Sequence, residues 1–329
     1  MISTLLPFRD AEDTLREALE SILEQRGCEL EVIAIDDGSR DRSAEIVASL
    51  ADPRVRSIVS GGVGLAGALE LGRREASGAW IARMDADDVA LPDRLRVQVA
   101  ALEASPRAGV MGARVELFGD GELGEGMQRY VAWQNALVTP EEHARDLFVE
   151  APLCHPSVVL RAEALEEVGG WRDVGWAEDY DLWLRLDAAG WELAKVPEVL
   201  LRWRHHRASA TFTSPLYTED ALRRARAAFL APKLTASGRA IAIWGAGPTG
   251  RRLARALEPH GVRASLWIDI DPRKIGRTAR GAPIASPEAL APGAQTIVVA
   301  VGARGARELV RAHLVERGFV ERVDFLCAA

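Results

Sequence analysis

Residues 80–89 read WIARMDADDV, a short apolar run (Trp80–Met84) followed at once by three aspartates. Side chains two apart in extended chain point the same way, so we expect Asp85 and Asp87 to face one site together. Two facing carboxylates repel each other, and a hard divalent ion such as Mg²⁺ or Mn²⁺ suits such oxygen ligands. The alternative is a solvated acidic turn that caps the next helix, with Asp88 as the cap.

The chain before this stretch alternates short apolar runs with segments of helical spacing. Strands are predicted at residues 2–6, 32–35 and 55–59, with amphipathic helices between them. Strands that alternate with helices imply a parallel sheet covered on both faces. Open parallel sheets bind ligands beyond the carboxyl ends of their strands, where the three aspartates lie.

The pattern is mixed beyond the aspartates and then starts afresh. We expect helices at 95–102, 141–149, 179–189 and 221–230, an extended segment at 110–118, and a glycine-rich acidic loop at 119–126. A boundary is predicted near 232–238, and a new strand follows at 240–244. The 329 residues suit about two domains. We assign residues 1–231 to the first, with a core to about 212 and a helical extension, and 238–329 to the second.

Composition excludes several classes of protein. Hydrophobic residues make up 48% and charged residues 27%, an ordinary globular balance, and the net charge of −7 argues against a nucleic-acid partner. The three cysteines share no metal-ligand spacing, so a reducing cytoplasm fits best. No segment approaches the ~20 apolar residues of a membrane span, so we expect at most peripheral contact with the inner face of a membrane. Such contact can come from Arg223, Arg224 and Arg226, although a solvated helix face is the simpler interpretation.

A second acidic motif, IDDGSRDRS, occupies residues 35–43. Asp36 and Asp37 precede Gly38, which suits a tight turn after a strand. One carboxylate can accept a hydrogen bond from a nucleobase N–H. Turn and helix-cap chemistry is the competing interpretation, since serine and aspartate are good helix starters.

Two further motifs come later in the chain. WAEDYDLWLRL (176–186) places Glu178 and Asp179 at the start of an amphipathic helix, where the helix dipole favours ionised carboxylates. A carboxylate there can act as general base on a hydroxyl, or it can simply be charge placed at a helix end. RWRHH (202–206) can hold a diphosphate or complete a metal shell, or it is a basic surface strand.

In order and in local sequence, these motifs resemble the family 2 glycosyltransferases over about residues 1–212. The resemblance rests on STLLPF (3–8), IDDGSRDRS, the run into and past MDADD (64–95), HPSVVLRAEALEEVGGW (155–171), AEDYDLWLRLDAAG (177–190) and WRHH (203–206). It implies a GT-A fold and an inverting, single-displacement transfer from a nucleotide-sugar donor, with UDP as the first choice of nucleotide. The QxxRW motif of processive polysaccharide synthases is absent, which favours transfer of single sugars in polysaccharide biosynthesis.

The resemblance also implies roles for individual residues. Mn²⁺ or Mg²⁺ would be held by Asp87, with Asp85 on the metal or the ribose and His206 near the metal or the diphosphate. The base would lie against Asp36 or Asp37, beside the backbone of Pro7 and Phe8. On the acceptor side, Asp179 would deprotonate the hydroxyl next to Glu178, with His155 and Trp176 close by. The acceptor can be a glycan, a lipid-linked molecule or a small molecule.

The C-terminal part carries a glycine fingerprint in the expected context. A predicted strand leads to Gly245, Gly247 and Gly250, and Asp269 follows the next strand. Such glycines let the backbone approach a pyrophosphate, and the acid can hold ribose hydroxyls. IDIDPRKIG and the final run resemble Rossmann-like tail domains found beside sugar-modifying enzymes. NAD or another nucleotide is one possible ligand, and a structural or regulatory module is the favoured interpretation.

Two other functions compete with sugar transfer. DADDV also fits the motif of haloacid-dehalogenase-like phosphatases, in which Asp85 would be a nucleophile, but that fold expects the motif after its first strand. A non-catalytic nucleotide-binding regulatory protein is the second alternative.

Overall fold

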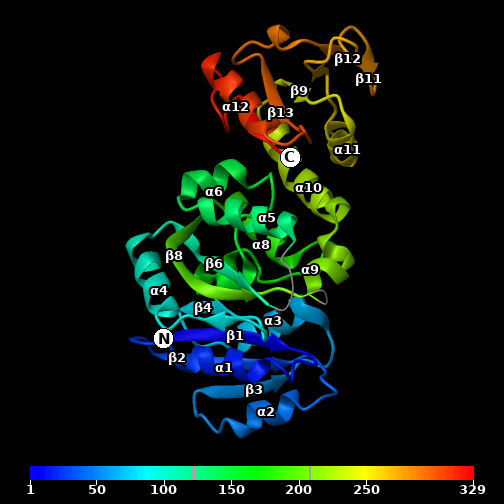
Figure 1. Ribbon diagram of the computed structural model, residues 1–329. Coiled ribbons are helices and arrows are strands. Elements are labelled where there is room, and N and C mark those ends of the chain that lie inside the picture. The colour runs from blue at the N-terminus through cyan, green and yellow to red at the C-terminus, as the bar shows by residue number, and fades with distance from the viewer. Residues whose placement is uncertain (120–123, 207–208) are drawn as a thin grey trace. The chain divides into compact units, whose positions relative to one another are not determined.

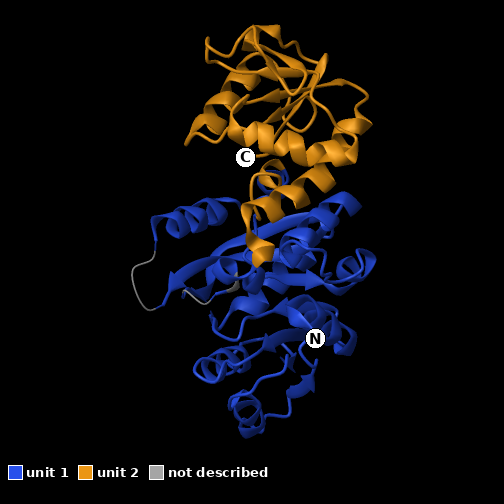
Figure 2. Ribbon diagram, turned by 90° about the vertical axis from the view of Figure 1, so that its right-hand side faces the viewer, with its two compact units in different colours: residues 1–144, 152–214 blue, residues 145–151, 215–329 orange. Residues whose placement is uncertain are grey.

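The computed structural model describes residues 1–119, 124–206 and 209–329 (Figure 1). The chain forms two compact units, one of residues 1–144 and 152–214 and one of residues 145–151 and 215–329 (Figure 2). Both units alternate strands with helices, so the predicted α/β class is confirmed. The glycine-rich loop predicted at 119–126 falls largely outside the described residues.

The first unit is built on an eight-stranded sheet in the order β3-β2-β1-β4-β7-β6-β8-β5. Its strands are β1 (Ile2–Phe8), β2 (Leu30–Asp36), β3 (Val55–Val59), β4 (Trp80–Arg83), β5 (Val89–Ala90), β6 (Ala108–Phe118), β7 (Val159–Arg161) and β8 (Glu192–Arg204). Its helices are α1 (Leu15–Leu23), α2 (Ser43–Ser49), α3 (Gly64–Glu75), α4 (Arg94–Ala104), α5 (Glu125–Ala136), η1 (His155–Ser157), α7 (Ala162–Glu167), α8 (Glu178–Ala189) and α9 (Ala210–Thr213). Helix α6 (Pro140–Asp146) ends in the second unit.

The N-terminal half of this sheet is parallel, as predicted. Strand β1 pairs in parallel with β2 and β4, and β2 pairs in parallel with β3. Because successive side chains of a strand face opposite ways, helices cover both faces. Helix α1 packs on the face that carries Leu6, and Gly72 of α3 lies against Leu5 and Ile35 on the other face.

The C-terminal half of the sheet is mixed. Strand β7 runs antiparallel to β4 and β6, and β5 runs antiparallel to β8. The last pairing sets Val89 opposite Arg202, which brings the turn after β4 to the end of β8. The sheet therefore joins residues 85–88 to residues 202–206.

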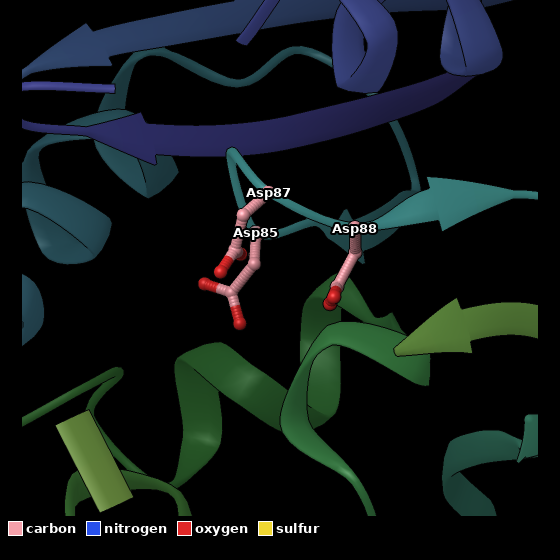
Figure 3. Close-up of side chains that lie close together, drawn as sticks. All are labelled: Asp85, Asp87 and Asp88. Atoms are coloured by element: carbon pink, nitrogen blue, oxygen red, sulfur yellow. The ribbon is translucent and has the colours of Figure 1, made fainter. Parts of the chain in front are cut away.

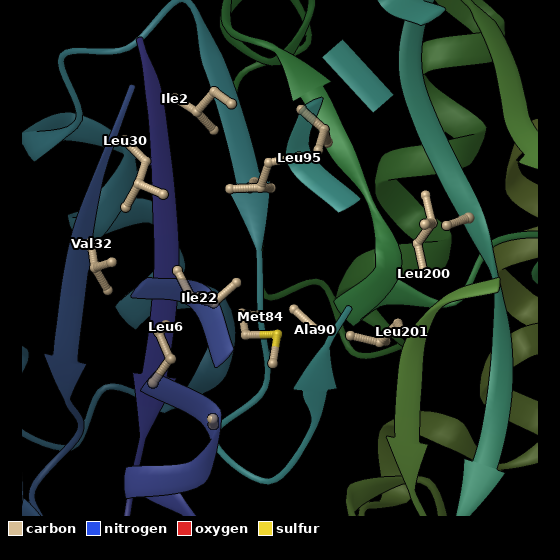
Figure 4. Close-up of a cluster of buried hydrophobic side chains, with 14 of the residues drawn as sticks. Ile2, Leu6, Ile22, Leu30, Val32, Met84, Ala90, Leu95, Leu200 and Leu201 are labelled. Atoms are coloured by element: carbon tan, nitrogen blue, oxygen red, sulfur yellow. The ribbon is translucent and has the colours of Figure 1, made fainter. Parts of the chain in front are cut away.

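The core of the first unit lies between α1, α4 and the sheet. Figure 4 shows apolar side chains from β1, β2, α1, α4 and β8 in one cluster. Leu6, Ile22, Leu95 and Leu201 are fully buried within it. Burial of such side chains is worth about 1.5–3 kcal/mol each, so this core fixes the strand ends that carry the acidic motifs.

The second unit has a six-stranded sheet in the order β11-β12-β10-β9-β13-β14. Its strands are β9 (Ala240–Trp244), β10 (Leu266–Ile268), β11 (Thr278–Ala279), β12 (Ala282–Ala285), β13 (Gln295–Val299) and β14 (Phe325–Cys327). Its helices are η2 (Pro215–Tyr217), α10 (Glu219–Ala236), α11 (Pro248–Leu257), η3 (Glu258–His260), η4 (Pro287–Ala289) and α12 (Ala306–Glu316). All pairings are parallel except that of β11 with β12.

Several elements differ from the sequence expectation. The helix predicted at 221–230 runs to Ala236, with Pro232 inside it, and the helix predicted at 141–149 ends at Asp146. Helices α5 and α7 and strand β7 were not predicted. Within the described parts of the chain, no helix has both the length and the apolar character that a bilayer crossing requires.

Candidate active site

The MDADD turn leaves β4 and brings three carboxylates together. One oxygen from each of Asp85, Asp87 and Asp88 lies within 4.8 Å of the others. Figure 3 shows all three side chains pointing to the same side of the turn. His206, from the end of β8, places Nε2 2.9 Å from Oδ2 of Asp87. The structure thus joins the predicted metal ligands Asp85, Asp87 and His206.

Asp88 is not a solvated helix cap, and that alternative is wrong. Its side chain is 1% exposed, and its Oδ1 accepts the backbone N–H of Arg204 at 2.7 Å. Arg204 also donates from Nε to the carbonyl of Asp87 at 2.7 Å and from Nη2 to Glu17 of α1 at 2.5 Å. Arg204 therefore clamps the acidic turn between β8 and α1.

The electrostatics of the turn favour a bound cation. Burial, followed by the charge of Asp85, raises the pKa of Asp87, and burial with both neighbouring aspartates raises the pKa of Asp88 well above its usual range. Oδ2 of Asp88 is buried and has no hydrogen-bond partner among the described residues. Oxygen donors that repel one another, with one oxygen unsatisfied, fit a hard divalent ion.

Arg83 is a residue that the sequence analysis missed. It ends β4 with a side chain 2% exposed, and its Nη1 lies 2.5 Å from Oδ1 of Asp85. Burial disfavours its charged form, but Asp85, Glu178 and Asp88 outweigh that effect and raise the pKa of Arg83. The signal was present as a single charged residue in an apolar strand, because such a residue is rarely buried unless it is paired.

Glu178 and Asp179 open α8 and are both buried. Trp171 donates from Nε1 to Nε2 of His155 at 3.0 Å, so the proton of the neutral ring belongs on Nδ1. That nitrogen faces Oε1 of Glu178 at 3.4 Å. Burial, followed by the charge of Arg83, lowers the pKa of His155, which keeps the ring neutral. His155, predicted on the acceptor side, thus contacts Glu178 and is itself buried.

Asp179 has the properties of a general base. Burial, followed by the neighbouring Glu178, raises the pKa of Asp179 to about 8. Its Oδ1 accepts the backbone N–H of Tyr180 at 2.6 Å. A carboxylate with its pKa near the working pH is the kind of group that removes a proton from a hydroxyl.

Trp176 lies just before α8 and is partly exposed. Its Nε1 donates to Oδ1 of the buried Asp181 at 3.2 Å, and Arg185 donates to the other oxygen at 2.7 Å. Asp181, the third acid of the motif, is therefore held in an internal network. The indole of Trp176 is fixed at the entrance to α8.

Asp36 and Asp37 follow β2 and organise their own turn. Oδ1 of Asp36 accepts the backbone N–H groups of Gly38 and Ser39, so the turn chemistry expected from the sequence is present. Asp37 accepts from the Ser60 hydroxyl at 2.5 Å and from the Gly64 N–H at 3.0 Å. The buried residues Pro7 and Phe8 end the neighbouring strand β1, and the carbonyl of Phe8 accepts the N–H of Asp37.

In the second unit, the three fingerprint glycines play different parts. A Cβ on Gly245 would come within 2.3 Å of the Ala300 carbonyl, and one on Gly250 within 2.0 Å of the Gly245 carbonyl. Only Gly247 faces open space. Asp269, the predicted ribose ligand, already accepts from the Ala246 N–H and from Lys274. Two of the glycines are therefore required by packing of the loop itself.

A comparison with protein-family models identifies the first unit. Residues 3–169, about half of the chain, match the model described as Glycosyl transferase family 2. This chain belongs to glycosyl transferase family 2. The phosphatase alternative for Asp85 is thereby replaced, and the chain is a glycosyltransferase.

Curated relatives carry the same activity in their names. The amylovoran biosynthesis glycosyltransferase AmsE of Erwinia amylovora is 30% identical, over 62% of this chain and 76% of that protein. A glycosyltransferase of Haemophilus influenzae is 30% identical, over 60% of this chain and 72% of that protein.

Solved structures share the GT-A fold. S. aureus TarS in complex with UDP-GlcNAc matches with a TM-score of 0.57 at 17% identity, over 79% of this chain and 72% of that one. The Pyrobaculum calidifontis mannosyltransferase PcManGT in complex with GDP-Man and Mn²⁺ matches with a TM-score of 0.50 at 21% identity, with the same coverage. At these identities, the likeness shows the fold of the family 2 unit.

Proposed function

We propose that this glycosyltransferase moves a single sugar from a UDP-sugar to an acceptor hydroxyl by a metal-dependent, inverting displacement. The observation that carries the proposal is one unit that holds both an acidic turn suited to a cation and a buried carboxyl of raised pKa. The charge of the buried Arg83 opposes the rise in pKa of both Asp87 and Asp179, so both carboxyl groups lie within electrostatic range of the same guanidinium.

Asp85, Asp87 and His206 are the proposed metal ligands, with Oδ2 of Asp88 as a further oxygen. The ligand set of carboxylates and one imidazole suits Mn²⁺ or Mg²⁺, and the mannosyltransferase of similar fold is in complex with GDP-Man and Mn²⁺. When bound, the ion would neutralise negative charge on the leaving diphosphate. The contribution of the chain is to hold these side chains on one turn, clamped by Arg204.

The nucleoside is proposed to bind at the neighbouring strand ends. Asp36 or Asp37 would accept a hydrogen bond from the base beside the backbone of Pro7 and Phe8, and Asp85 would contact the ribose or the metal. Support comes from position, since these residues lie at the carboxyl ends of β1, β2 and β4, which are parallel neighbours.

Asp179 is the proposed base. Its ionised carboxylate takes the proton of the acceptor hydroxyl. At the same time, the oxygen of that hydroxyl attacks the anomeric carbon, and the bond between this carbon and the diphosphate oxygen breaks. Attack from the face opposite the leaving group inverts the configuration. Burial, followed by the charge of Glu178, which contacts His155, keeps the pKa of Asp179 high, so the carboxylate is a stronger base than a solvated one.

The acceptor is proposed to enter past Trp176, whose fixed indole offers a flat apolar surface to a sugar ring, with His155 acting behind Glu178. A glycan, lipid-linked or small-molecule acceptor fits this arrangement. A role in polysaccharide biosynthesis is favoured by the relative named for amylovoran synthesis.

We further propose that residues 1–231 form the transferase domain, although the helical extension after Ser214 packs in the second compact unit, and that 238–329 form a Rossmann-like domain. Parallel strands β10-β9-β13-β14 and the glycine turn before α11 support the second assignment.

Calorimetric titration with UDP, GDP and dTDP, with and without Mn²⁺, tests the function. We expect one nucleoside diphosphate to bind only with metal, and Asp87→Ala to abolish that binding. Asp93→Ala, which changes a half-exposed aspartate at the start of α4, is the matched control. Absence of metal-dependent binding to all three nucleotides would overturn the proposal.

A further inference from the structure

The second unit contains a cavity of about 460 Å³ that the transferase reaction does not use. All of its lining residues belong to this unit, and they come from residues 149–150, α10, the start of α11, the loop between β13 and α12 with the first turn of α12, and Ala329. The cationic and hydroxyl side chains that define it are Arg223, Arg226, Thr249, Arg252, Arg304 and Arg307.

We propose that this cavity binds the phosphates of a diphosphate ester. The site is built from different residues than the acidic turn of the first unit, and it needs no metal. Its ligand chemistry is shared by nucleotide sugars and dinucleotides.

The charge of the lining favours an anion. Three glutamates also line the cavity, and each has a cationic neighbour; Ala329, the last residue of the sequence, lines it as well. Glu219 lies 3.6 Å from Arg223, Glu308 lies 3.0 Å from Arg307, and Glu150 lies 3.8 Å from Arg226. Arg223 also pairs with Asp220 at 2.9 Å. In the part of the chain that the structure describes, Arg252 and Arg304 form no ion pair, so two guanidinium groups of the lining are not neutralised by a carboxylate.

The backbone also contributes positive electrostatic potential to the cavity. Strands β9 and β13 are parallel neighbours, and the chain order reverses between them, since β10 and β12 lie on one side and β14 on the other. Ligands of open α/β sheets bind at such a switch point. Helices α11 and α12 have ten and eleven residues, and Thr249 and Arg307 of their first turns line the cavity. Helix N-termini carry partial positive charge and present unpaired N–H groups.

Arg226 provides an independent indication of a ligand. Its side chain is 12% exposed, and its Nε is buried without a hydrogen-bond partner among the described residues. Its other contacts are long, with Nη1 3.4 Å from the Ala328 carbonyl. A buried guanidinium N–H group without a hydrogen-bond acceptor lowers the stability of the fold. A ligand that supplies an acceptor removes this cost, and phosphate oxygens are acceptors whose geometry matches arginine well.

The size of the site points to more than one phosphate. The cavity is within the range of about 300–1,000 Å³ typical of small-molecule pockets, and its arginines come from three separate segments. The two phosphates of a diphosphate can contact arginines of more than one of these segments at once. A single phosphate group presents its oxygens mainly to one segment. The favoured ligand is therefore an ester of pyrophosphate.

The test is calorimetry on the full chain carrying Asp87→Ala, in EDTA, so that metal-dependent donor binding is removed. Inorganic pyrophosphate is the first probe, followed by UDP-glucose and by ADP-ribose. We expect pyrophosphate to bind, and Arg252→Glu with Arg304→Glu to weaken binding by at least about tenfold. Arg255→Glu, at an exposed position of α11 outside the cavity, should leave the affinity unchanged. Both cavity positions are exposed, and an unchanged melting temperature would confirm folding of the variants.

The two esters identify the source of the diphosphate. Tighter binding of UDP-glucose than of pyrophosphate supports a nucleotide-sugar ligand, and tighter binding of ADP-ribose supports a dinucleotide. Hydrogen exchange should show protection within 249–252 and 301–307. The proposal is overturned if none of the three probes binds in EDTA, or if the double variant binds them as well as its parent does. Metal-dependent binding of UDP to the wild-type chain is measured separately, so this failure is distinct from failure of the transferase assignment.

Discussion

Each unit places its candidate site at the carboxyl ends of the parallel strands of its own sheet, but the side chains there carry opposite charges. In the first unit, Asp85, Asp87 and Asp88 follow β4, and Asp36 and Asp37 follow β2. In the second unit, arginines surround the ends of β9 and β13. A phosphate can approach the second edge directly, but it can approach the first only with a cation between. The architecture supplies the position of each site, and the side chains at the edge decide its chemistry.

Metal removal should produce the largest difference between the two proposed sites. We expect EDTA to reduce sugar transfer by about 1,000-fold or more, because the acidic turn then repels the diphosphate. Pyrophosphate affinity of the second unit should not change. Turnover is followed by release of nucleoside diphosphate, and readdition of Mn²⁺ should restore it. Full turnover in EDTA would show that the acidic turn works without a cation.

Substitution of the base should have the next largest effect. Asp179→Asn keeps the size of the side chain but removes the proton acceptor, so we expect kcat to fall by at least about 100-fold. Donor binding should persist, because it depends on the metal turn and the base pocket. Asp187→Asn, on the same helix α8, should stay near wild type. Equal losses in both variants would assign the effect to the helix and not to the base.

The pH dependence of sugar transfer should differ from that of pyrophosphate binding. The pKa of Asp179 is about 8, and the base works ionised, so kcat/KM should rise about tenfold per pH unit below that value and level off above it. The charge of Glu178 helps to raise this pKa, so Glu178→Gln should shift the rise to lower pH, whereas Glu163→Gln on α7 should not. Pyrophosphate affinity should follow only the ionisation of pyrophosphate itself, because arginines stay charged across this range. A flat kcat/KM profile between pH 6 and 9 would exclude Asp179 as the base.

The smallest effect concerns the glycine turn of the second unit. Gly250→Ala places a Cβ against the Gly245 carbonyl and should lower the free energy of unfolding of this unit by about 1–3 kcal/mol. Gly247→Ala meets open space and should change it by less than about 0.5 kcal/mol. Urea denaturation followed by tryptophan fluorescence measures both. Equal losses would mean that packing does not distinguish the two positions.

Local pattern predicted the parts of the first site but not how they meet. Asp85, Asp87 and Asp179 were identified because each lies at a strand or helix end, where a motif of a few residues shows the chemistry. The contact of Asp87 with His206 depends on the antiparallel pairing of β5 with β8. Strand β5 has two residues, which is too short for a periodicity to be seen.

The second site was not predictable for a different reason. Arg223 and Arg226 were interpreted as a solvated helix face, because helical spacing alone does not show what a face packs against. Only the fold brings them to the loop at 301–307. The fingerprint glycines immediately precede or begin α11, but none of them lines the cavity, and backbone packing accounts for Gly245 and Gly250.

The bond between the Arg204 N–H and Asp88 joins residues 116 positions apart. At roughly 5–20 residues per second, a ribosome needs on the order of ten seconds to travel from one to the other. Throughout that interval the nascent chain carries its aspartates without the strand that clamps them and without His206. Each newly made molecule can therefore assemble the proposed metal site only after residue 206 has been made, and a fragment released before that point has the motif but not the site.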